Sequence, residues 1–282
     1  MSNQVEYQEI IYQVDSPVAT ITMNRPAQLN AFTNRMLMEI CHAVDRAEQD
    51  ESVVGIVLTG AGRGFSAGMD INALDRAAGG ERRASEDLSA LAASPGDASI
   101  GEGYDTGFLY LLTVRKPVIA AVNGACAGLG FCFALLADIR FVEPQAKITT
   151  AFVQRGLVAE HGSSWLLPRL IGTGKALDLL WSGRKLSGEE AHAIGLAEYL
   201  SGAGDSAREA GNYIRQLAAS GSPTSVMVMK RQVYRHLQTG VTDATRESIR
   251  LMNESLVRDD FKEGVRSFIE RRPPNFKRIG AA

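Results

Sequence analysis

Two glycine-rich turns, each placed between an apolar stretch and a predicted helix, constrain the fold of this chain most. The first glycine loop, residues 60–70, follows the apolar stretch 53–59, and the second glycine loop, residues 123–130, follows the stretch 117–122. Glycine lets backbone amides turn toward a ligand and lets that ligand approach the chain closely. Two such loops can direct two N–H donors at one oxygen atom, which is the arrangement that stabilises an oxyanion.

The regions around these loops predict an α/β fold. Residues 18–23 alternate in polarity and predict a strand, and Thr33 is a suitable cap for a helix that runs to about Glu48. The stretch 53–59 predicts a buried strand, and strand, glycine turn and helix recur over residues 118–137. A further short strand is predicted at residues 139–142. Strands separated by helices pair in parallel through crossover connections.

Residues 75–106 differ from this pattern, because they are polar, small and rich in turn-forming residues. A long segment of this kind inside a compact domain is typical of a lid or of a mobile surface loop. The sequence does not fix its conformation, and we expect it to shape the ligand pocket.

The pattern becomes helical from Ser163 onward. The sequence Ser187-Gly188-Glu189-Glu190 predicts a capping box at the start of a short helix. Further helices are predicted at residues 205–220, 225–238 and 242–272, and Pro273-Pro274 would stop the last one. We therefore expect a core of residues 1–200 and a helical C-terminal region of residues 201–282.

The charge, hydropathy and cysteine content of the chain limit the kinds of partner and ligand that we expect it to bind. The 282 residues carry a formal net charge of -2, which gives no electrostatic reason to expect binding to nucleic acid or to an anionic membrane. No apolar run approaches the ~20 residues that a membrane span needs, and the first residues do not resemble a signal peptide. Cys41, Cys126 and Cys132 have neither metal-ligand spacing nor the number of a disulfide framework. We expect a cytoplasmic protein with reduced thiols and no metal.

Several segments carry a resemblance to a known family. They are Asn24-Arg25-Pro26, Leu29-Asn30-Ala31, residues 65–70, 116–124, 137–138, 182–184, 195–196 and 268–276. In this order, over nearly the whole chain, they resemble the crotonase (enoyl-CoA hydratase/isomerase) superfamily. The resemblance implies a spiral of ββα turns with a helical C-terminal region that forms a homotrimer, or a hexamer of two stacked trimers. It also implies a coenzyme A thioester as the substrate, with no separate cofactor.

The resemblance also assigns roles to residues of the two glycine loops. The backbone N–H groups of Met69 and Leu129 would form the oxyanion hole, and Leu129 would open a helix whose dipole adds to the field. The residues implied in substrate or CoA binding are Leu29, Ser66, Ala67, Gly68, Asp70, Gly128 and Lys277. Arg25, Arg76, Arg82 and Arg83 are candidates for binding the phosphates, the alternative being ordinary surface arginines.

The side chains that would move a proton distinguish reactions within this family. Its hydratases use two glutamates, and the matching positions here hold Cys132 and Phe152, neither of which has a carboxylate. Residues 156–165 resemble the segment that carries the single acidic base of the family's Δ3,Δ2-enoyl-CoA isomerases, and Glu160 falls on that base. The sequence therefore predicts an enoyl-CoA isomerase in which Glu160 is the catalytic base.

Alternatives remain at this point. Glu160 could instead cap the helix that begins near Ser163, since a carboxylate is favoured there. His161 would orient a water or the acyl group, or lie on the surface, and no cation is apparent that would activate Cys132 as a nucleophile. A hydratase or an acyl-CoA hydrolase on the same fold is the alternative function. A non-enzymatic RNA-binding relative is disfavoured by the net charge of -2.

Overall fold

The computed structural model describes residues 5–79, 86–101, 103–104 and 106–281. The strands are β1 (Ile10–Asp15), β2 (Val18–Met23), β3 (Gly55–Gly60), β4 (Gly64–Ser66), β5 (Val118–Val122), β6 (Ala125–Ala127), β7 (Ile139–Val142), β8 (Lys147–Thr149), β9 (Leu186–Ser187) and β10 (Tyr199–Leu200). The α-helices are α1 (Asn34–Gln49), α2 (Ile71–Ala78), α3 (Tyr110–Thr113), α4 (Leu129–Leu136), α5 (Ser163–Ile171), α6 (Thr173–Ser182), α7 (Gly188–Ala193), α8 (Ser206–Ser220), α9 (Pro223–His236), α10 (Val241–Leu256) and α11 (Asp259–Glu270). Short 3₁₀ helices cover Pro26–Gln28, Ser89–Leu91, Ala98–Ile100 and Val153–Arg155.

Successive pairs of strands are shared between two sheets. The first strand of each pair (β3, β5, β7) joins a six-stranded sheet of order β1-β2-β3-β5-β7-β10, and the second (β4, β6, β8) joins a four-stranded sheet of order β4-β6-β8-β9. The helices α2, α4 and α5 follow these pairs. Strands β2, β3, β5 and β7 run parallel, as predicted, and the unpredicted short strand β10 also pairs in parallel with β7, whereas β1 is antiparallel to β2. This repeated strand–strand–helix unit confirms the α/β class and the expected ββα spiral.

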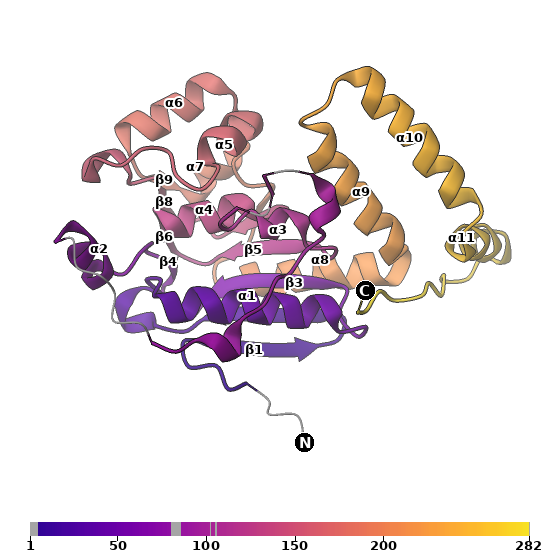
Figure 1. The fold of residues 1–282 in the computed structure, drawn as a ribbon, viewed down its shortest axis with the longest axis horizontal. Coiled ribbons are helices and arrows are strands. Elements are labelled where there is room, and N and C mark those ends of the chain that lie inside the picture. Colours follow the sequence, from indigo (N-terminus) through magenta and orange to yellow (C-terminus); the bar gives the residue numbers. More distant parts are fainter. Residues whose placement is uncertain (1–4, 80–85, 102, 105, 282) are drawn as a thin grey trace.

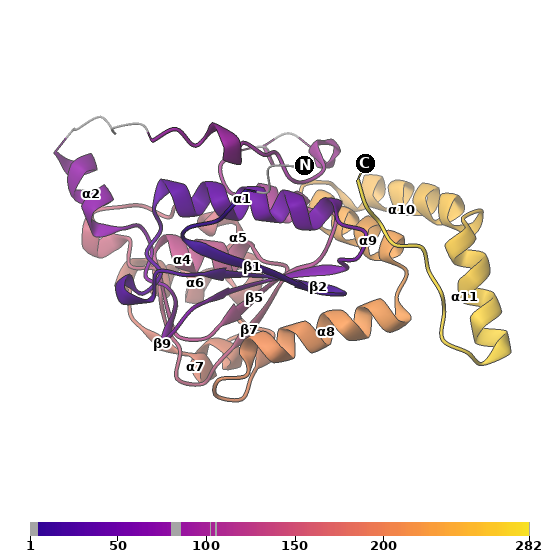
Figure 2. The same cartoon turned by 90° about the horizontal axis from the view of Figure 1, so that it is seen from below.

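The two faces of the larger sheet are covered by helices from distant parts of the chain. Helix α1 lies over one face and α8 over the other (Figure 2). Thr33 caps α1, as predicted, by accepting a hydrogen bond of 3.0 Å from the Met36 amide. The buried side chains of α1 recur at helical spacing, so that one stripe of the helix packs on the sheet. On the opposite face, Ile214 of α8 packs with Val57 and Ile119.

The helices α9, α10 and α11 lie together at the end of the molecule away from α2 (Figures 1 and 2). The prediction of one helix over residues 242–272 is wrong, because α10 ends at Leu256 and α11 begins at Asp259. Arg258 between them has extended backbone angles and caps α11. Asp259 and Asp260 then occupy the first turn, where the helix dipole favours negative charge.

The described part of the polar segment 75–106 contributes several side chains to the core. Leu91, Ile100 and Tyr104 are buried, and the Tyr104 hydroxyl donates a 2.8 Å hydrogen bond to the Tyr234 carbonyl. Residues 80–85, 102 and 105 of this segment lie outside the described residues. Among the helices that the structure does describe, none is both long enough and apolar enough to cross a membrane.

A largely buried ion pair attaches α9 to the core. The Lys230 ammonium contacts a carboxylate oxygen of Asp138 at 2.7 Å, and the Tyr234 hydroxyl donates to the other oxygen at 2.8 Å. The Val118 amide at the start of β5 donates to the same carboxylate at 2.7 Å. Asp138 therefore links a strand of the larger sheet to the first of the three terminal helices.

We expect Lys230→Met to lower the free energy of unfolding by about 3 kcal/mol, because removing one partner leaves a buried charge uncompensated. Urea unfolding at a fixed protein concentration measures the change. Lys262→Met is the matched control, because the Lys262–Asp259 pair is exposed and its loss should cost no more than about 0.5 kcal/mol. Equal losses for the two variants would contradict the anchoring role of Lys230.

Candidate active site

Strand pairing brings the two glycine loops together. In the smaller sheet, β4 and β6 are parallel neighbours with Ser66 opposite Cys126, so the residues that follow each strand emerge at the same edge. A Cβ atom built on Gly68 would lie 2.8 Å from the Ala127 carbonyl oxygen and 3.4 Å from the Leu129 nitrogen. The backbone at Gly68 also has φ +98°, a conformation that other residues rarely adopt. The first loop can therefore approach the second this closely only with glycine at position 68.

Each loop presents a backbone amide, that of Met69 and that of Leu129, for which no acceptor lies within the described part of the chain. Phe32 forms a parallel bridge with Met69, in which the Phe32 amide donates to the Gly68 carbonyl and the Asp70 amide donates to the Phe32 carbonyl. Because the residues on either side of Met69 make these two bonds, the N–H of Met69 itself points away from Phe32. Leu129 is the first residue of α4, where a helix leaves its N–H groups without intrahelical acceptors. The helix dipole makes this end of α4 electropositive, which favours a negatively charged oxygen nearby.

The two amides belong to residues that line one cavity with Glu160. This cavity, which we call the amide cavity, has a volume of ≈ 250 Å³. Its lining residues are Ala67, Gly68, Met69, Leu74, Gly128, Leu129, Ala151, Phe152, Arg155, Leu157, Glu160 and His161. The lining residues from Ala151 to His161 come from the segment after β8, and β8 pairs in parallel with β6. The three residues predicted to carry the chemistry, Met69, Leu129 and Glu160, thus line the same cavity.

Glu160 is half-buried and lies beside α4. Its carbonyl oxygen is 3.7 Å from the Cys132 sulfur, which places Glu160 next to the position where the hydratases of the resembled family carry their first glutamate. The cap of α5 is Gly162, with no side-chain hydrogen bond, so the alternative that Glu160 caps this helix is wrong. Within the described ranges, no residue donates a hydrogen bond to the Glu160 carboxylate and none forms an ion pair with it. The carboxylate is therefore available to act on a ligand.

Neither Cys132 nor Phe152 offers an acid or a base. Both are buried, and Phe152 is one of the residues that line the amide cavity. Burial, together with the nearby charge of Glu160, raises the pKa of the Cys132 thiol to about 12. The thiol is therefore protonated at neutral pH and is not a nucleophile there.

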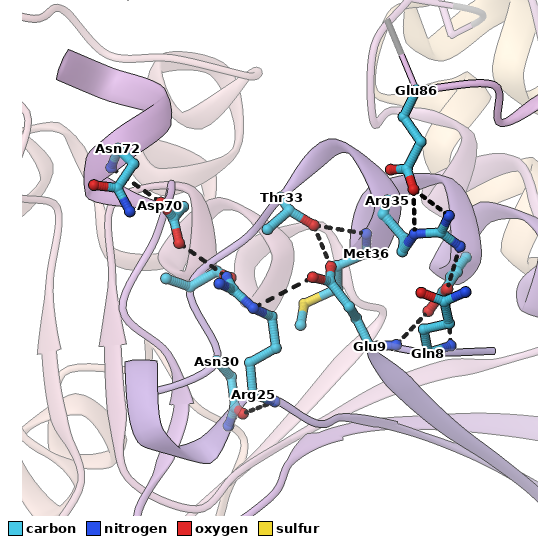
Figure 3. Close-up of polar contacts among 12 residues, drawn as sticks. Gln8, Glu9, Arg25, Asn30, Thr33, Arg35, Met36, Asp70, Asn72 and Glu86 are labelled. Atoms are coloured by element: carbon cyan, nitrogen blue, oxygen red, sulfur yellow. Dashed lines mark hydrogen bonds and ion pairs between the residues drawn. The ribbon is translucent and has the colours of Figure 1, made fainter. Parts of the chain in front are cut away.

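An ion-pair network fixes the end of the first loop (Figure 3). The Arg25 guanidinium contacts Asp70 at 3.0 Å and Glu9 at 3.4 Å, and donates to the Ala31 carbonyl at 2.6 Å. Burial opposes ionisation of Asp70, but hydrogen bonds from Arg25 and the Asn72 amide outweigh it, so its pKa lies below the ordinary value. Asp70 directly follows Met69, and the network therefore restrains the Met69 amide.

The remaining predicted binding residues are spread over several places. The side chain of Ser66 is fully buried and donates to the Asn30 carbonyl at 2.8 Å, so only its neighbours Ala67 and Gly68 reach the cavity. Leu29 closes the turn before α1 in a left-handed conformation, with φ 49°. Lys277 lies on the tail that follows α11, apart from the amide cavity. The side chains of Arg76, Arg82 and Arg83 lie outside the described part of the chain.

Two residues at this site were not predicted. Arg155, at the end of the 3₁₀ helix after β8, lines the cavity, and its guanidinium donates a 2.8 Å hydrogen bond to the Ala151 carbonyl. Phe108 packs its ring on His161, with the ring centroids 4.9 Å apart. No sequence motif includes either residue. Each lies near the site only because of the course that its loop takes in the folded chain, which the neighbouring residues do not reveal.

Comparisons with known proteins agree with this geometry. A family model described as enoyl-CoA hydratase/isomerase matches residues 13–279. A 1,2-epoxyphenylacetyl-CoA isomerase of Escherichia coli is 34% identical over 95% of this chain and 97% of its own, and an enoyl-CoA hydratase of Alternaria alternata is 33% identical over 94% and 86%. The crystal structure of a putative enoyl-CoA hydratase/isomerase family protein from Hyphomonas neptunium superposes with a TM-score of 0.81, at 32% identity, over 96% of this chain and 98% of that one.

Proposed function

The chain belongs to the enoyl-CoA hydratase/isomerase family, and on that premise we propose that it moves the double bond of an enoyl-CoA thioester through a 1,3-proton shift. It is an enzyme of a family that acts on acyl-CoA substrates. The observation that carries the proposal is a single unpaired carboxylate, Glu160, in the cavity that also holds the two free amides. One carboxylate is sufficient for a proton shift, whereas the two-glutamate arrangement for holding water is missing at Cys132 and Phe152.

The reaction begins when the thioester oxygen accepts hydrogen bonds from the Met69 and Leu129 amides. Glu160 then removes a proton from C2 of a 3-enoyl thioester, and the electron pair of the broken C2–H bond moves onto the thioester oxygen to give a dienolate conjugated with the C3–C4 double bond. The amides and the dipole of α4 stabilise the charge on the dienolate oxygen. The protonated Glu160 returns the same proton at C4, which leaves a 2-enoyl thioester and restores the carboxylate.

Hydration or hydrolysis is the second candidate, because the relatives of this chain include proteins named as enoyl-CoA hydratases. In that case Glu160 alone would activate a water molecule. A reaction in H₂¹⁸O separates the two, since isomerisation takes no oxygen from the solvent. We expect mass spectrometry of the products from 3-hexenoyl-CoA to show 2-hexenoyl-CoA without ¹⁸O. Labelled free acid as the main product from 3-hexenoyl-CoA, or labelled 3-hydroxyhexanoyl-CoA from 2-hexenoyl-CoA without any isomerisation of the 3-enoyl substrate, would contradict the isomerase proposal.

We also propose that the enzyme is a homotrimer, or a dimer of trimers, assembled through the C-terminal helices. Val241, Phe268 and Ile269 are 81%, 85% and 72% exposed, and a groove of ≈ 490 Å³ lies beside Phe268. Monomeric proteins seldom expose apolar side chains this densely. Light scattering should give a mass of three or six times 30.4 kDa. We expect Phe268→Glu to yield the 30.4 kDa monomer, and an unchanged assembly would exclude this surface as the interface.

A further inference from the structure

Glu160 belongs to a segment that no helix or strand holds in place. The segment lies between the 3₁₀ helix Val153–Arg155 and α5. It is mostly on the surface, and Val158 is 77% exposed. Two residues with left-handed backbone angles follow Glu160, namely His161 with φ 49° and Gly162 with φ 77°. A general base has to be held within about 0.5 Å of its productive position, so contacts from elsewhere are needed to orient Glu160.

Two donors hold the backbone carbonyl of Glu160. The Ser163 amide, in the first turn of α5, donates to it at 2.9 Å. The Cys132 thiol, on α4, donates to it across 28 residues of sequence, with the sulfur 3.7 Å from the oxygen. Because the pKa of this thiol is raised to about 12, the sulfur carries the proton that the contact requires at neutral pH. The first contact is local to the segment, whereas the second ties the segment to the core.

The helix that carries Cys132 also carries one of the two amides of the cavity. Leu129 and Cys132 lie three residues apart on α4, and residues at this spacing are neighbours on one face of a helix. The rise along the helix axis between them is about 4.5 Å. Every residue of α4 is buried, so the helix is packed on all sides. The Leu129 amide and the Glu160 carbonyl are therefore related through one short, tightly packed element.

The next residue of α4 supports the segment through a chain of rings. The ring of Phe133 packs on that of Phe108 with their centroids 4.9 Å apart, and the ring of Phe108 packs on that of His161, also at 4.9 Å. These rings restrict the position of His161 but make no polar contact with Glu160. The Cys132 thiol adds a polar link from α4 to the backbone of the base itself.

We propose that Cys132 is a positioning residue for Glu160. Its thiol fixes the backbone of Glu160 to α4 and thereby keeps the carboxylate in place beside a thioester bound at the Leu129 amide. The inference rests on the proposed function, because it assumes that Glu160 removes the proton. It deepens that function by giving a role to a side chain that takes no part in the proton transfer.

Substitution of Cys132 tests this role. We expect Cys132→Ala, which lacks the donor, to lower kcat for the isomerisation of 3-hexenoyl-CoA about 3–10-fold, as the loss of one neutral hydrogen bond allows, and to leave KM nearly unchanged. Cys132→Ser keeps a donor at this position and should therefore be more active than Cys132→Ala. Cys41→Ala is the matched control, because the Cys41 thiol also donates to a backbone carbonyl, that of Ala93 at 3.6 Å, but lies outside the amide cavity. Its loss should leave kcat unchanged.

A double-mutant cycle shows whether Cys132 acts through Glu160. In the Glu160→Gln background, Cys132→Ala should not lower the residual rate further, because no base remains to be positioned. An equal fold-loss in both backgrounds, an unchanged kcat in Cys132→Ala, or a Cys132→Ser variant no more active than Cys132→Ala would overturn the inference.

Thermal unfolding shows whether each variant is folded. If Cys132→Ala does not fold, Cys132→Val, which fills the position without a donor, takes its place in the same comparisons. Full activity of the Glu160→Gln single variant would instead contradict the proposed function, so the two failures are distinguishable.

Discussion

Glu160→Gln is expected to lower kcat for the isomerisation of 3-hexenoyl-CoA by about 10²–10⁴-fold, the usual contribution of a positioned general base. Glutamine has nearly the same shape as glutamate but cannot accept the C2 proton. Because the substrate still binds through the amides and the acyl group, KM should change little. Steady-state kinetics that follow formation of the conjugated 2-enoyl product give both constants.

Glu189→Gln is the control for this prediction. Glu189 is an exposed glutamate in the first turn of α7, and it is not among the residues that line the amide cavity. Its loss should leave kcat unchanged, whereas Glu160→Asp should retain part of the activity because the base is shortened but not removed. A loss of activity in Glu160→Gln of less than about fivefold would place the catalytic base elsewhere, since a general base contributes far more.

Leu129→Pro is expected to lower kcat by about 10²–10³-fold, because proline has no N–H and one of the two oxyanion donors is lost. The first position of a helix tolerates proline well, since its N–H has no intrahelical acceptor in any case. Gly128 before it is already outside the helical region, with φ 53° and ψ -121°, so the restriction that proline imposes on its predecessor is met by glycine. The fold should therefore survive a change that removes the donor.

Leu129→Met is the control that distinguishes the effect of losing the amide N–H from the effect of changing the side chain. Methionine keeps the N–H and has nearly the volume of leucine, so kcat should stay within a few-fold of the original. Thermal unfolding of both variants shows whether the structure is retained. If the proline variant is folded and fully active, the Leu129 amide does not stabilise the transition state.

Much of the core could be predicted because its signals are local. The Thr33 cap, the stripe on α1 and the parallel strands β3, β5 and β7 each follow from a few adjacent residues. The short strands β4, β6 and β8 could not be predicted, because two or three residues show no periodicity and their pairing partners are distant in sequence. The break between α10 and α11 was missed for a related reason, since Arg258 leaves the helix without a glycine or proline to mark it.

Parts of the candidate site, too, could be predicted from local sequence, and other parts could not. The two glycine loops were predictable because they carry a strong local pattern, whereas the roles proposed for Met69, Leu129 and Glu160 followed from the family resemblance. The partners of Arg25 could not be predicted, since Glu9 and Asp70 lie 16 and 45 residues away in sequence and only the fold brings the three together.

The amide donors and the acid are held by different parts of the protein. Main-chain atoms fixed by the pairing of β4 with β6 hold the donors, while the acid belongs to the connection between β8 and α5. On the proposed mechanism, libraries of substitutions among residues 150–162 would therefore alter which proton or nucleophile meets the thioester, while the amides that activate its carbonyl would be retained. Such libraries would be a direct route to new acyl-CoA chemistry on an otherwise unchanged scaffold.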